Sequence, residues 1–200
     1  MLALVDFGAG NLRSVEKTLG AVGAEVQVTA DPEVVLAADR VVLPGVGAFA
    51  DGRRALEERG VLAALRRVAE RGTPLLGICL GMQLLFERGE EHGDCEGLGL
   101  LPGAVRRFHG PLKVPHTGWN RVRATRRSPL LEGLPDGAYA YFNHSFYCDA
   151  ASDDDVLART AYGLAYPSVV ERGRLYGVQF HPEKSQRVGL TIMRNFVERC

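Results

Sequence analysis

The first ninety residues alternate short apolar runs with longer amphipathic stretches. Residues 2–5, 41–43 and 75–78 are short and apolar, which is typical of strands buried on both faces of a sheet. In the stretches between them, apolar side chains recur every three to four residues, as they do along the buried face of a helix. This alternation predicts successive βαβ units and a mainly parallel sheet.

The second half of the chain has a different texture, because glycine and proline become frequent after Gly89. Arg172 and Gly173, between two apolar runs, indicate a hairpin, and an amphipathic helix is predicted over residues 186–200. Short strands joined by turns are expected at four places, residues 104–108, 119–124, 139–142 and 156–161.

Together these elements predict a single α/β domain over residues 1–200. It should have three layers: a mainly parallel central sheet with helices on both faces, and added antiparallel strands in the C-terminal half. The 46% hydrophobic content of the 200 residues is enough for an ordinary apolar core.

The charge balance and the cysteines exclude several classes of protein. With 24 basic and 24 acidic residues, the chain is not expected to bind nucleic acid or an anionic membrane through a basic face. Its longest mostly apolar uncharged stretch, residues 72–86, is too short to span a bilayer. The four cysteines show neither disulfide nor metal spacing, and the start of the chain has no basic leader. A cytoplasmic protein is therefore expected.

Candidate chemistry lies where the run at 75–78 meets the helix after it. Residues 77–81 read Gly-Ile-Cys-Leu-Gly, which is the form of a nucleophile elbow. Glycines on both sides of Cys79 permit a sharp turn that exposes the thiol at the carboxyl end of the strand. A helix N-terminus lowers a thiol pKa to about 3.5–7.5, against about 8.5 in a free cysteine. Cys79 is the candidate nucleophile, and the alternative for this motif alone is a buried core cysteine.

A cysteine nucleophile needs a base, and His181 is the strongest candidate. It ends an apolar run and precedes Pro182 and Glu183, whose carboxylate can reach back to the imidazole and fix its tautomer. The alternative is a surface ion pair at a strand end. The remaining histidines are in loop-like contexts and are not expected to act as the base; they are at positions 92, 109, 116 and 144.

A turn after the run at 41–43 could complete the site. Residues 44–47 read Pro-Gly-Val-Gly, and such a turn can bring backbone N–H groups close to the elbow. An oxyanion hole needs two donors aimed at the developing negative charge. The Leu80 amide is the natural first donor, and Val46 or Gly47 would supply the second. Alone, the glycine turn also fits a simple strand-to-helix connection.

Taken together, these residues resemble the class I, triad-type glutamine amidotransferases, which carry Cys, His and Glu in this order. The similarity is strongest to the glutaminase subunits of imidazole glycerol phosphate synthases. Small departures are His116-Thr117 in one block and Phe146, where a tyrosine is expected. Six blocks carry the resemblance over nearly the whole chain, at residues 6–12, 44–49, 77–85, 115–120, 141–146 and 177–185.

The resemblance implies an activity and a partner. Glutamine would be hydrolysed to glutamate and ammonia through a glutamyl thioester on Cys79, with His181 as base and acid and with no cofactor or metal. The ammonia would pass to a (β/α)8-barrel cyclase subunit, in a heterodimer that serves histidine biosynthesis. The residues implied to hold the substrate are Gly45, Gly47, Gln83, Ser145 and Phe146. Those implied to lie toward the barrel are Asn11, Trp119, Tyr141 and Lys184.

Two of these expectations can be sharpened from the residues. The neighbours Gly118 and Asn120 suggest that Trp119, the only tryptophan, lies on a surface loop, where an aromatic anchor suits an interface. Because a glutaminase that fires without an acceptor wastes glutamine, its activity should be gated. Glycines at 45 and 47 let a peptide rotate, so the Val46 N–H could point away from the oxyanion position at rest.

Other functions are weighed against single residues. A same-fold glutaminase of the vitamin B6 pathway should carry Gly-Gly-Glu-Ser where residues 44–47 stand, and a non-catalytic scaffold would be expected to lose a triad member. A dinucleotide-binding loop after residues 8–10 would need a glycine where the chain has Arg13. A metal site on His92 and Cys95 lacks a second ligand pair.

Overall fold

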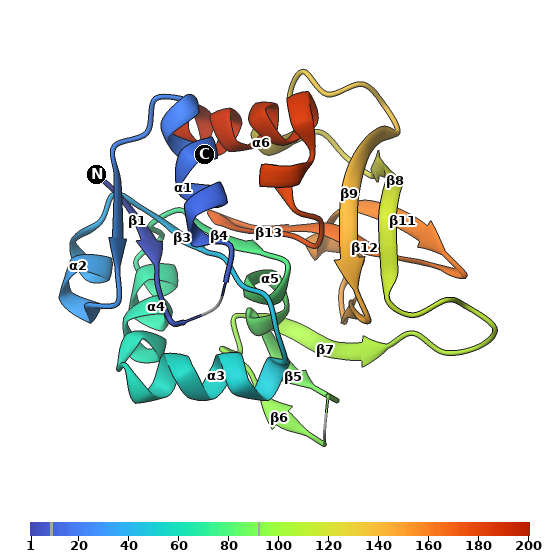
Figure 1. The fold of residues 1–200 in the computed structure, drawn as a ribbon, viewed down its shortest axis with the longest axis horizontal. Coiled ribbons are helices and arrows are strands. Elements are labelled where there is room, and N and C mark those ends of the chain that lie inside the picture. The colour runs from blue at the N-terminus through green and yellow to red at the C-terminus, as the bar shows by residue number, and fades with distance from the viewer. Residues whose placement is uncertain (9, 92) are drawn as a thin grey trace.

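The computed structural model describes residues 1–8, 10–91 and 93–200. Within these residues the strands form one nine-stranded and one four-stranded sheet, with helices on both faces of the larger sheet (Figure 1). The strand order of the large sheet is β2-β1-β3-β4-β13-β12-β11-β8-β9. The three-layer α/β architecture expected from the sequence is confirmed.

Five neighbouring strands form the parallel half of the large sheet. Four of them come from the first eighty residues, and the fifth comes from near the C-terminus. Their bounds are β1 Leu2–Val5, β2 Val26–Thr29, β3 Arg40–Leu43, β4 Leu75–Ile78 and β13 Leu175–Val178. Pairing of β13 with β4 carries the C-terminal region to the carboxyl end of β4, where Cys79 follows.

Helices cover the two faces of this sheet (Figure 1). Pro32 occupies the first turn of α2, and the Asp31 side chain caps this helix by accepting a hydrogen bond from the Glu33 amide. One face carries α1 Leu12–Ala21 and α6 Gln186–Arg199. The other carries α2 Pro32–Ala37, α3 Phe49–Glu58 and α4 Val61–Glu70.

The core is divided by the sheet into two layers. Along β1, Ala3 and Val5 pack with the helices of one face, whereas Leu2 and Leu4 pack with the helices of the other. Side chains of a strand point alternately to its two faces, so a run that is apolar at every position must be covered on both sides. This explains why the central parallel strands have apolar runs, whereas β2 at the sheet edge contains Gln27 and Thr29.

The remaining strands of the large sheet are antiparallel, and Gly173, with φ +59°, makes the predicted hairpin turn between β12 and β13. One expectation is wrong here, because His116 and His144 were predicted in loops but lie on strands. Trp119 lies on the strand predicted over residues 119–124 and not on the surface loop that its neighbours suggested. Both strands extend further than β propensity alone indicated, because β8 pairs with β9 from His116 to Val122. The bounds are β8 His116–Ala124, β9 Ala138–His144, β11 Val156–Tyr162 and β12 Leu164–Arg172.

The small sheet was largely missed by the sequence analysis. The helix expected after the run at 75–78 is α5, Leu80–Leu84, and it is short because Phe86 pairs with Leu101 in this sheet. The strands are β5 Phe86–Gly89, β6 Cys95–Glu96, β7 Leu101–Arg107 and β10 Phe146–Ala150. Three short 3-10 helices complete the elements, at Pro129–Leu131, Asp153–Asp155 and Pro182–Lys184. Among the described residues, no helix is long and apolar enough to cross a membrane.

Candidate active site

Cys79 lies on a strained turn between β4 and α5. Its φ of 53° and ψ of −108° are unusual for a residue with a side chain, and such strain is typical of a nucleophile elbow. The flanking glycines are required by close contacts. A Cβ at Gly77 would lie 2.7 Å from the Gly81 backbone, and one at Gly81 would lie 1.8 Å from the Leu43 carbonyl oxygen. The structure therefore contains the turn that the Gly-Ile-Cys-Leu-Gly sequence suggests.

His181 and Glu183 lie together beside this elbow. The imidazole Nδ1 is 2.9 Å from Glu183 Oε1, and the two side chains are only 3% and 1% exposed. Pro182 begins the short 3-10 helix that turns the carboxylate back toward the ring. Ser185 fixes this segment, because its hydroxyl donates to the His181 carbonyl and accepts from the Tyr141 amide. A surface ion pair, the alternative for this histidine, does not fit such burial.

The surroundings of His181 favour its protonated form. Burial by itself lowers the pKa of a histidine, but hydrogen bonds with Cys79 and Glu183 outweigh it and raise the pKa of His181 to about 9. Because Nδ1 faces Glu183, Nε2 is the nitrogen left to exchange a proton with the thiol. The arrangement suits a cysteine that gives up its proton to a histidine before it attacks.

Asn11 also belongs to this part of the site. Its side-chain Nδ2 donates a hydrogen bond to Glu183 Oε1. The residue itself has a φ of 75°, which directs the start of α1 past the carboxylate. The sequence analysis placed Asn11 only toward a partner. In the structure its amide holds one of the predicted triad residues, and it is partly buried.

The predicted oxyanion hole is not assembled in this structure. The Leu80 amide, expected as the first donor, donates instead to the Gly45 carbonyl at 3.3 Å. Because a trans peptide directs its C=O and N–H to opposite sides, the Val46 N–H points away from Leu80. Gly47 has a φ of +115°, which a residue with a side chain rarely adopts. This is the resting orientation that the proposed gate requires.

A chain of side-chain amides lines the wall beside the thiol. Gln83 Nε2 donates to the Phe146 carbonyl at 3.1 Å and to Gln179 Oε1 at 3.2 Å. Gln179 Nε2 lies 3.8 Å from Cys79 Sγ. Sequence reasoning missed Gln179 because it matches no motif by itself. The available signal was a polar residue inside an apolar run that is buried throughout.

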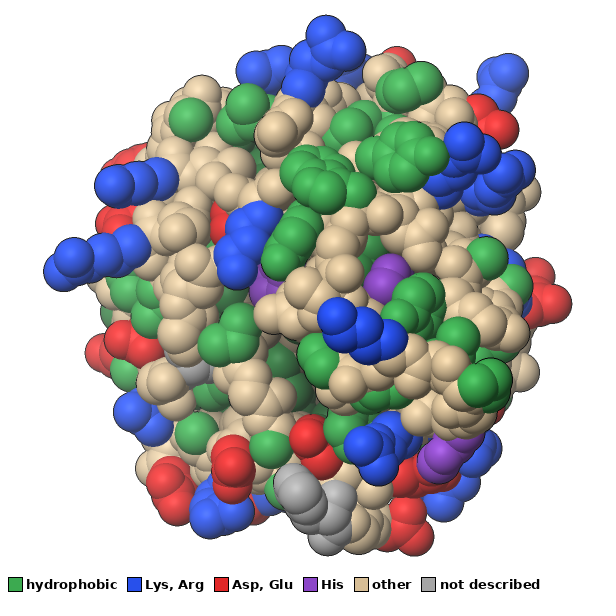
Figure 2. Space-filling model, turned by 45° about the vertical axis from the view of Figure 1, so that its right-hand side comes forward, with side chains coloured by type: hydrophobic (Ala, Val, Ile, Leu, Met, Phe, Trp, Pro, Cys, Tyr) green, Lys and Arg blue, Asp and Glu red, His purple; other side chains and the backbone are tan. Residues whose placement is uncertain are grey.

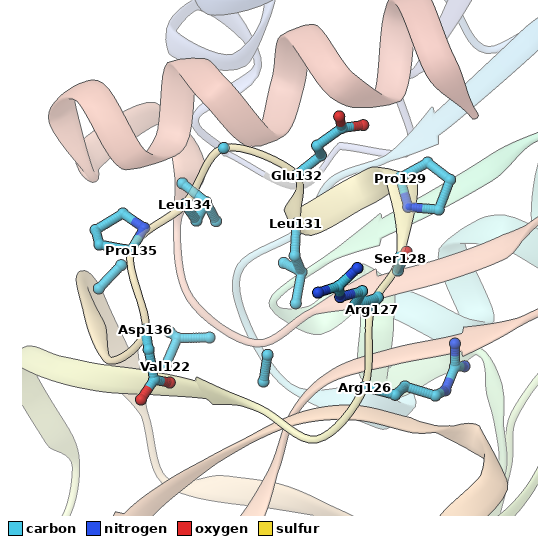
Figure 3. A pocket seen from close by; sticks show the side chains of 13 residues that line it. Val122, Arg126, Arg127, Ser128, Pro129, Leu131, Glu132, Leu134, Pro135 and Asp136 are labelled. Carbon is cyan, nitrogen blue, oxygen red and sulfur yellow. The ribbon is translucent and has the colours of Figure 1, made fainter.

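A hollow of about 560 Å³ lies at Ser145 and Phe146, two of the residues expected to hold substrate. His109 and three charged side chains line it as well: Glu90, Glu91 and Arg107. A separate hollow of about 630 Å³ is enclosed by β8 and the loop after it, within residues 122–138 (Figure 3). That second hollow contains none of the residues predicted for the site.

Three of the residues expected toward a partner lie together: Trp119 on β8, Tyr141 on β9 and Lys184 at the end of the adjacent 3-10 helix. Trp119 is 47% exposed and makes an edge contact with Tyr141, whose ring centroid is 6.0 Å away. The Lys184 Nζ lies 5.8 Å from the centroid of the same tyrosine ring. Neighbouring Tyr139 is 48% exposed. Figure 2 shows large hydrophobic side chains beside basic ones on this side of the molecule.

The metal site that was weighed on His92 and Cys95 cannot be examined, because His92 lies outside the described residues. Across residues 1–8, 10–91 and 93–200, no group of three or more His, Cys, Asp or Glu side chains is placed to hold a metal ion. His109, another histidine set aside as the base, is exposed.

The fold and this site define an amidotransferase. The family described as "Glutamine amidotransferase class-I" matches residues 3–200, and the chain belongs to it. The "Imidazole glycerol phosphate synthase subunit HisH" of Moorella thermoacetica is 52% identical over 197 residues, 98% of this chain and 94% of the relative. The protein of the same name from Bacillus cereus is 50% identical over 196 residues, 98% and 93% of the two chains.

Solved structures show the same fold at low identity. A chain titled "Crystal structure of glutamine amidotransferase" has a TM-score of 0.78 at 22% identity and covers 98% of this chain and 97% of its own. "Structure of PurLQS from Thermotoga maritima" has a TM-score of 0.76 at 20% identity, over 98% and 96%.

Proposed function

We propose that this chain is the glutaminase subunit of an imidazole glycerol phosphate synthase and acts in histidine biosynthesis. The observation that carries the proposal is the buried assembly of Cys79, His181 and Glu183, in a chain half identical to proteins of that name along nearly its whole length. A glutaminase of the vitamin B6 pathway and a non-catalytic scaffold are not favoured. The relatives are named as subunits of imidazole glycerol phosphate synthase, which argues against the vitamin B6 pathway. All three triad residues are present, which argues against a scaffold.

The triad would work as a cysteine nucleophile with a histidine base. His181 takes the Cys79 proton, and the sulfur attacks the side-chain carbonyl carbon of glutamine. The tetrahedral intermediate collapses, His181 protonates the leaving nitrogen, and ammonia departs from a glutamyl thioester. Water, deprotonated by His181, then attacks the thioester, and glutamate leaves as the thiol is restored. Glu183 holds the imidazole in the required tautomer throughout.

The negative charge that develops on the glutamine carbonyl oxygen needs hydrogen-bond donors. In this structure the Leu80 amide is not free to donate, because it is bonded to the Gly45 carbonyl. We assign the oxyanion hole to Leu80 together with Val46 or Gly47, which requires the turn at 44–47 to rotate away from its present contact with Leu80. The substrate-binding group is Gly45, Gly47, Gln83, Ser145 and Phe146, supported by the hollow at Ser145 and by the amide chain from Gln83 to the thiol.

The partner is a (β/α)8-barrel cyclase subunit in a heterodimer, and residues 1–200 act as one glutaminase domain in the cytoplasm. The docking face includes Trp119, Tyr141 and Lys184, because an exposed aromatic cluster with an adjacent basic side chain suits an interface. Asn11, also expected toward the barrel, contacts the triad through its hydrogen bond to Glu183. Ammonia passes to the partner without release to solvent.

The test is a glutaminase assay on the pure chain, repeated with a barrel subunit of a relative and its nucleotide substrate. Glutamine-dependent formation of imidazole glycerol phosphate is expected only with both subunits. The proposal is wrong if the complex forms and makes product from ammonium salts but never from glutamine.

A further inference from the structure

Two buried histidines near the site have no part in the mechanism above. His116 on β8 and His144 on β9 are cross-strand partners, and they are only 3% and 6% exposed. The His116 ring is stacked between Tyr162 and Phe142, with centroids 4.0 Å and 5.0 Å away. Two polar rings placed in an aromatic core need a defined set of hydrogen bonds.

The two ends of this set fix the direction of its hydrogen bonds. The Asn120 amide is oriented by its other contacts, since Oδ1 accepts from the Arg121 amide at 2.8 Å and Nδ2 donates to the Ala161 carbonyl at 2.9 Å. Asn120 Nδ2 is therefore the atom 3.3 Å from His116 Nε2, which must accept. At the other end, His144 Nδ1 lies 2.7 Å from the Phe146 carbonyl oxygen, so it must donate.

The direction of the hydrogen bond between the two histidine rings follows from their charge. Burial lowers the pKa of His116 to about 4 and that of His144 to about 3, so both are neutral at pH 7 and each has one N–H. His116 therefore carries its proton on Nδ1 and donates to His144 Nε2, 3.2 Å away. The Tyr166 hydroxyl, 3.2 Å from both nitrogens, agrees with this direction because it can accept from one and donate to the other.

This series of hydrogen bonds ends at the Phe146 carbonyl oxygen, which also contacts a side chain of the thiol site. The Phe146 carbonyl also accepts from Gln83 Nε2, and Gln83 contacts Gln179, whose amide lies beside Cys79 Sγ. At Ser145 the backbone leaves β9 of the large sheet and enters β10 of the small one. Phe146 pairs with Arg107 of β7, and the Ser145 carbonyl accepts from the Phe108 amide at 3.1 Å. The Phe146 carbonyl itself accepts from two side chains, His144 and Gln83.

We propose that His144, oriented by His116 and Asn120, is a positioning residue of the glutaminase site. Its Nδ1–H holds the Phe146 carbonyl, and through it the Gln83 amide, in place beside Cys79. Its tautomer is imposed from the surface by the Asn120 amide. The catalytic consequence rests on the proposed function, whereas the tautomers do not.

The tautomers can be measured without any activity. Nitrogen-15 NMR of the histidine rings in the full chain at pH 7 distinguishes a protonated from an unprotonated ring nitrogen. Both His116 and His144 should be neutral with the proton on Nδ1. A proton on His144 Nε2, or a charged His144, would overturn the proposal. In Asn120→Asp, where an acceptor replaces the donor, His116 should become charged or move its proton to Nε2; an unchanged ring would contradict the imposed direction.

The catalytic consequence is tested with two substitutions that differ in one donor. An Asn side chain can place its NH₂ group near the position of Nδ1, whereas Gln reaches the position of Nε2 and leaves the Phe146 carbonyl without this donor. In the complex with a barrel subunit, His144→Gln should raise the KM for glutamine roughly 3- to 10-fold, the scale of one hydrogen bond. In His144→Asn the KM should lie close to the wild-type value. In both variants kcat should change less than KM.

The outcomes separate this proposal from the proposed function. Thermal unfolding of both variants identifies a purely structural role. The positioning role would be overturned if the two variants lost the same stability and showed the same rise in KM. Wild-type protein without glutaminase activity in the complex would reject the proposed function and leave the NMR result to decide the hydrogen-bond direction alone. Active wild type with unchanged KM in His144→Gln would reject positioning and leave the glutaminase intact.

Discussion

The two sides of Cys79 are built differently. On one side, His181 and Glu183 are buried, paired at 2.9 Å and tied to β9 through Ser185. On the other, the Leu80 amide is engaged by the Gly45 carbonyl, so the donors for an oxyanion are not available. The half of the site that moves protons is assembled in the isolated chain, whereas the half that stabilises charge is not. Control of this enzyme should therefore act on charge stabilisation.

The difference has a local cause in packing. The His181 side continues a strand paired in the sheet and is stiffened by Pro182, so its geometry is set by the fold. The turn at 44–47 has less support. A Cβ at Gly47 would meet nothing within 4 Å, and Val46 is 40% exposed. Few contacts hold this turn in one orientation, which allows a partner to change it.

The largest effect should follow removal of the nucleophile. Cys79→Ser should lower glutamine-dependent synthesis by the complex on the order of 10⁶-fold, the scale seen when a hydrolase loses its nucleophile. Synthesis from added ammonium salts should stay at the wild-type level, because that chemistry belongs to the partner. Loss of both activities would indicate a structural role for Cys79 instead.

Covalent labelling checks the same assignment on the wild-type protein. A diazo-ketone analogue of glutamine should label Cys79 and none of the other three cysteines, as judged by peptide mass spectrometry. Burial raises the pKa of the Cys148 and Cys200 thiols, so they should not compete. Cys95 is partly exposed and is the natural internal control. Labelling mainly at Cys95 would contradict the assignment.

The next effect concerns the assembled side. Glu183→Gln keeps the shape of the side chain but removes the charge, and it should lower kcat about 10⁴-fold because the imidazole loses its orienting carboxylate. Glu183 raises the pKa of His181, so His181 should also lose its proton at a lower pH than the wild-type value of about 9. An NMR titration of His181 measures this shift. A shift to higher pH would contradict the role of Glu183.

A smaller effect is expected on the unassembled side. A methyl group at Gly45 would lie 3.1 Å from Leu80 Cβ and from the Phe7 ring, and crowding of this kind costs about 1–3 kcal/mol. Gly45→Ala should therefore weaken the resting contact and reduce the activation ratio by about 5- to 100-fold. The ratio compares glutamine hydrolysis by the complex with and without nucleotide ligand. Gly20→Ala in α1, whose methyl would meet nothing within 4 Å and whose φ is not positive, is the control for an added methyl group away from the turn. An unchanged ratio in Gly45→Ala would remove this turn from the gate.

The last effect is on stability, and it distinguishes His116 and His144 from His181. The pKa values of His116 and His144 are lowered on folding, so the unfolded chain binds more protons as pH falls from 6.5 toward 4. Stability should decline there by up to about 1.4 kcal/mol per pH unit for each ring. The raised pKa of His181 acts oppositely: its contribution is present below pH 6.5 and is lost as pH rises through about 9.

Urea unfolding at a series of pH values measures both trends. His144→Asn, which removes one of the buried rings, should flatten the decline between pH 6.5 and 4. An equally steep decline in this variant would show that other groups cause it.

Much of the fold could be predicted because the central parallel strands are buried on both faces and are mostly apolar. The nucleophile elbow could be predicted for a related reason. Gly77 and Gly81 approach other backbone atoms so closely that no side chain fits there, and these glycines mark the motif in the sequence. The small sheet could not be predicted, because its strands are short and their partners are distant in sequence. Gln179 and the orientation of the Asn11 amide carry no local signal either. Both depend on β13 and α1 meeting at the carboxyl end of β4.

The central claim has two parts. His181 and Glu183 are already placed for proton transfer in the isolated chain, whereas the oxyanion donors become available only after the turn at 44–47 changes its orientation. The most direct measurement is the rate of glutamine hydrolysis by the isolated chain and by the complex, with and without the nucleotide ligand of the barrel. One missing oxyanion donor costs about 100- to 1,000-fold, so the liganded complex should exceed the isolated chain by roughly that factor. An isolated chain that hydrolyses glutamine as fast as the liganded complex would contradict the claim.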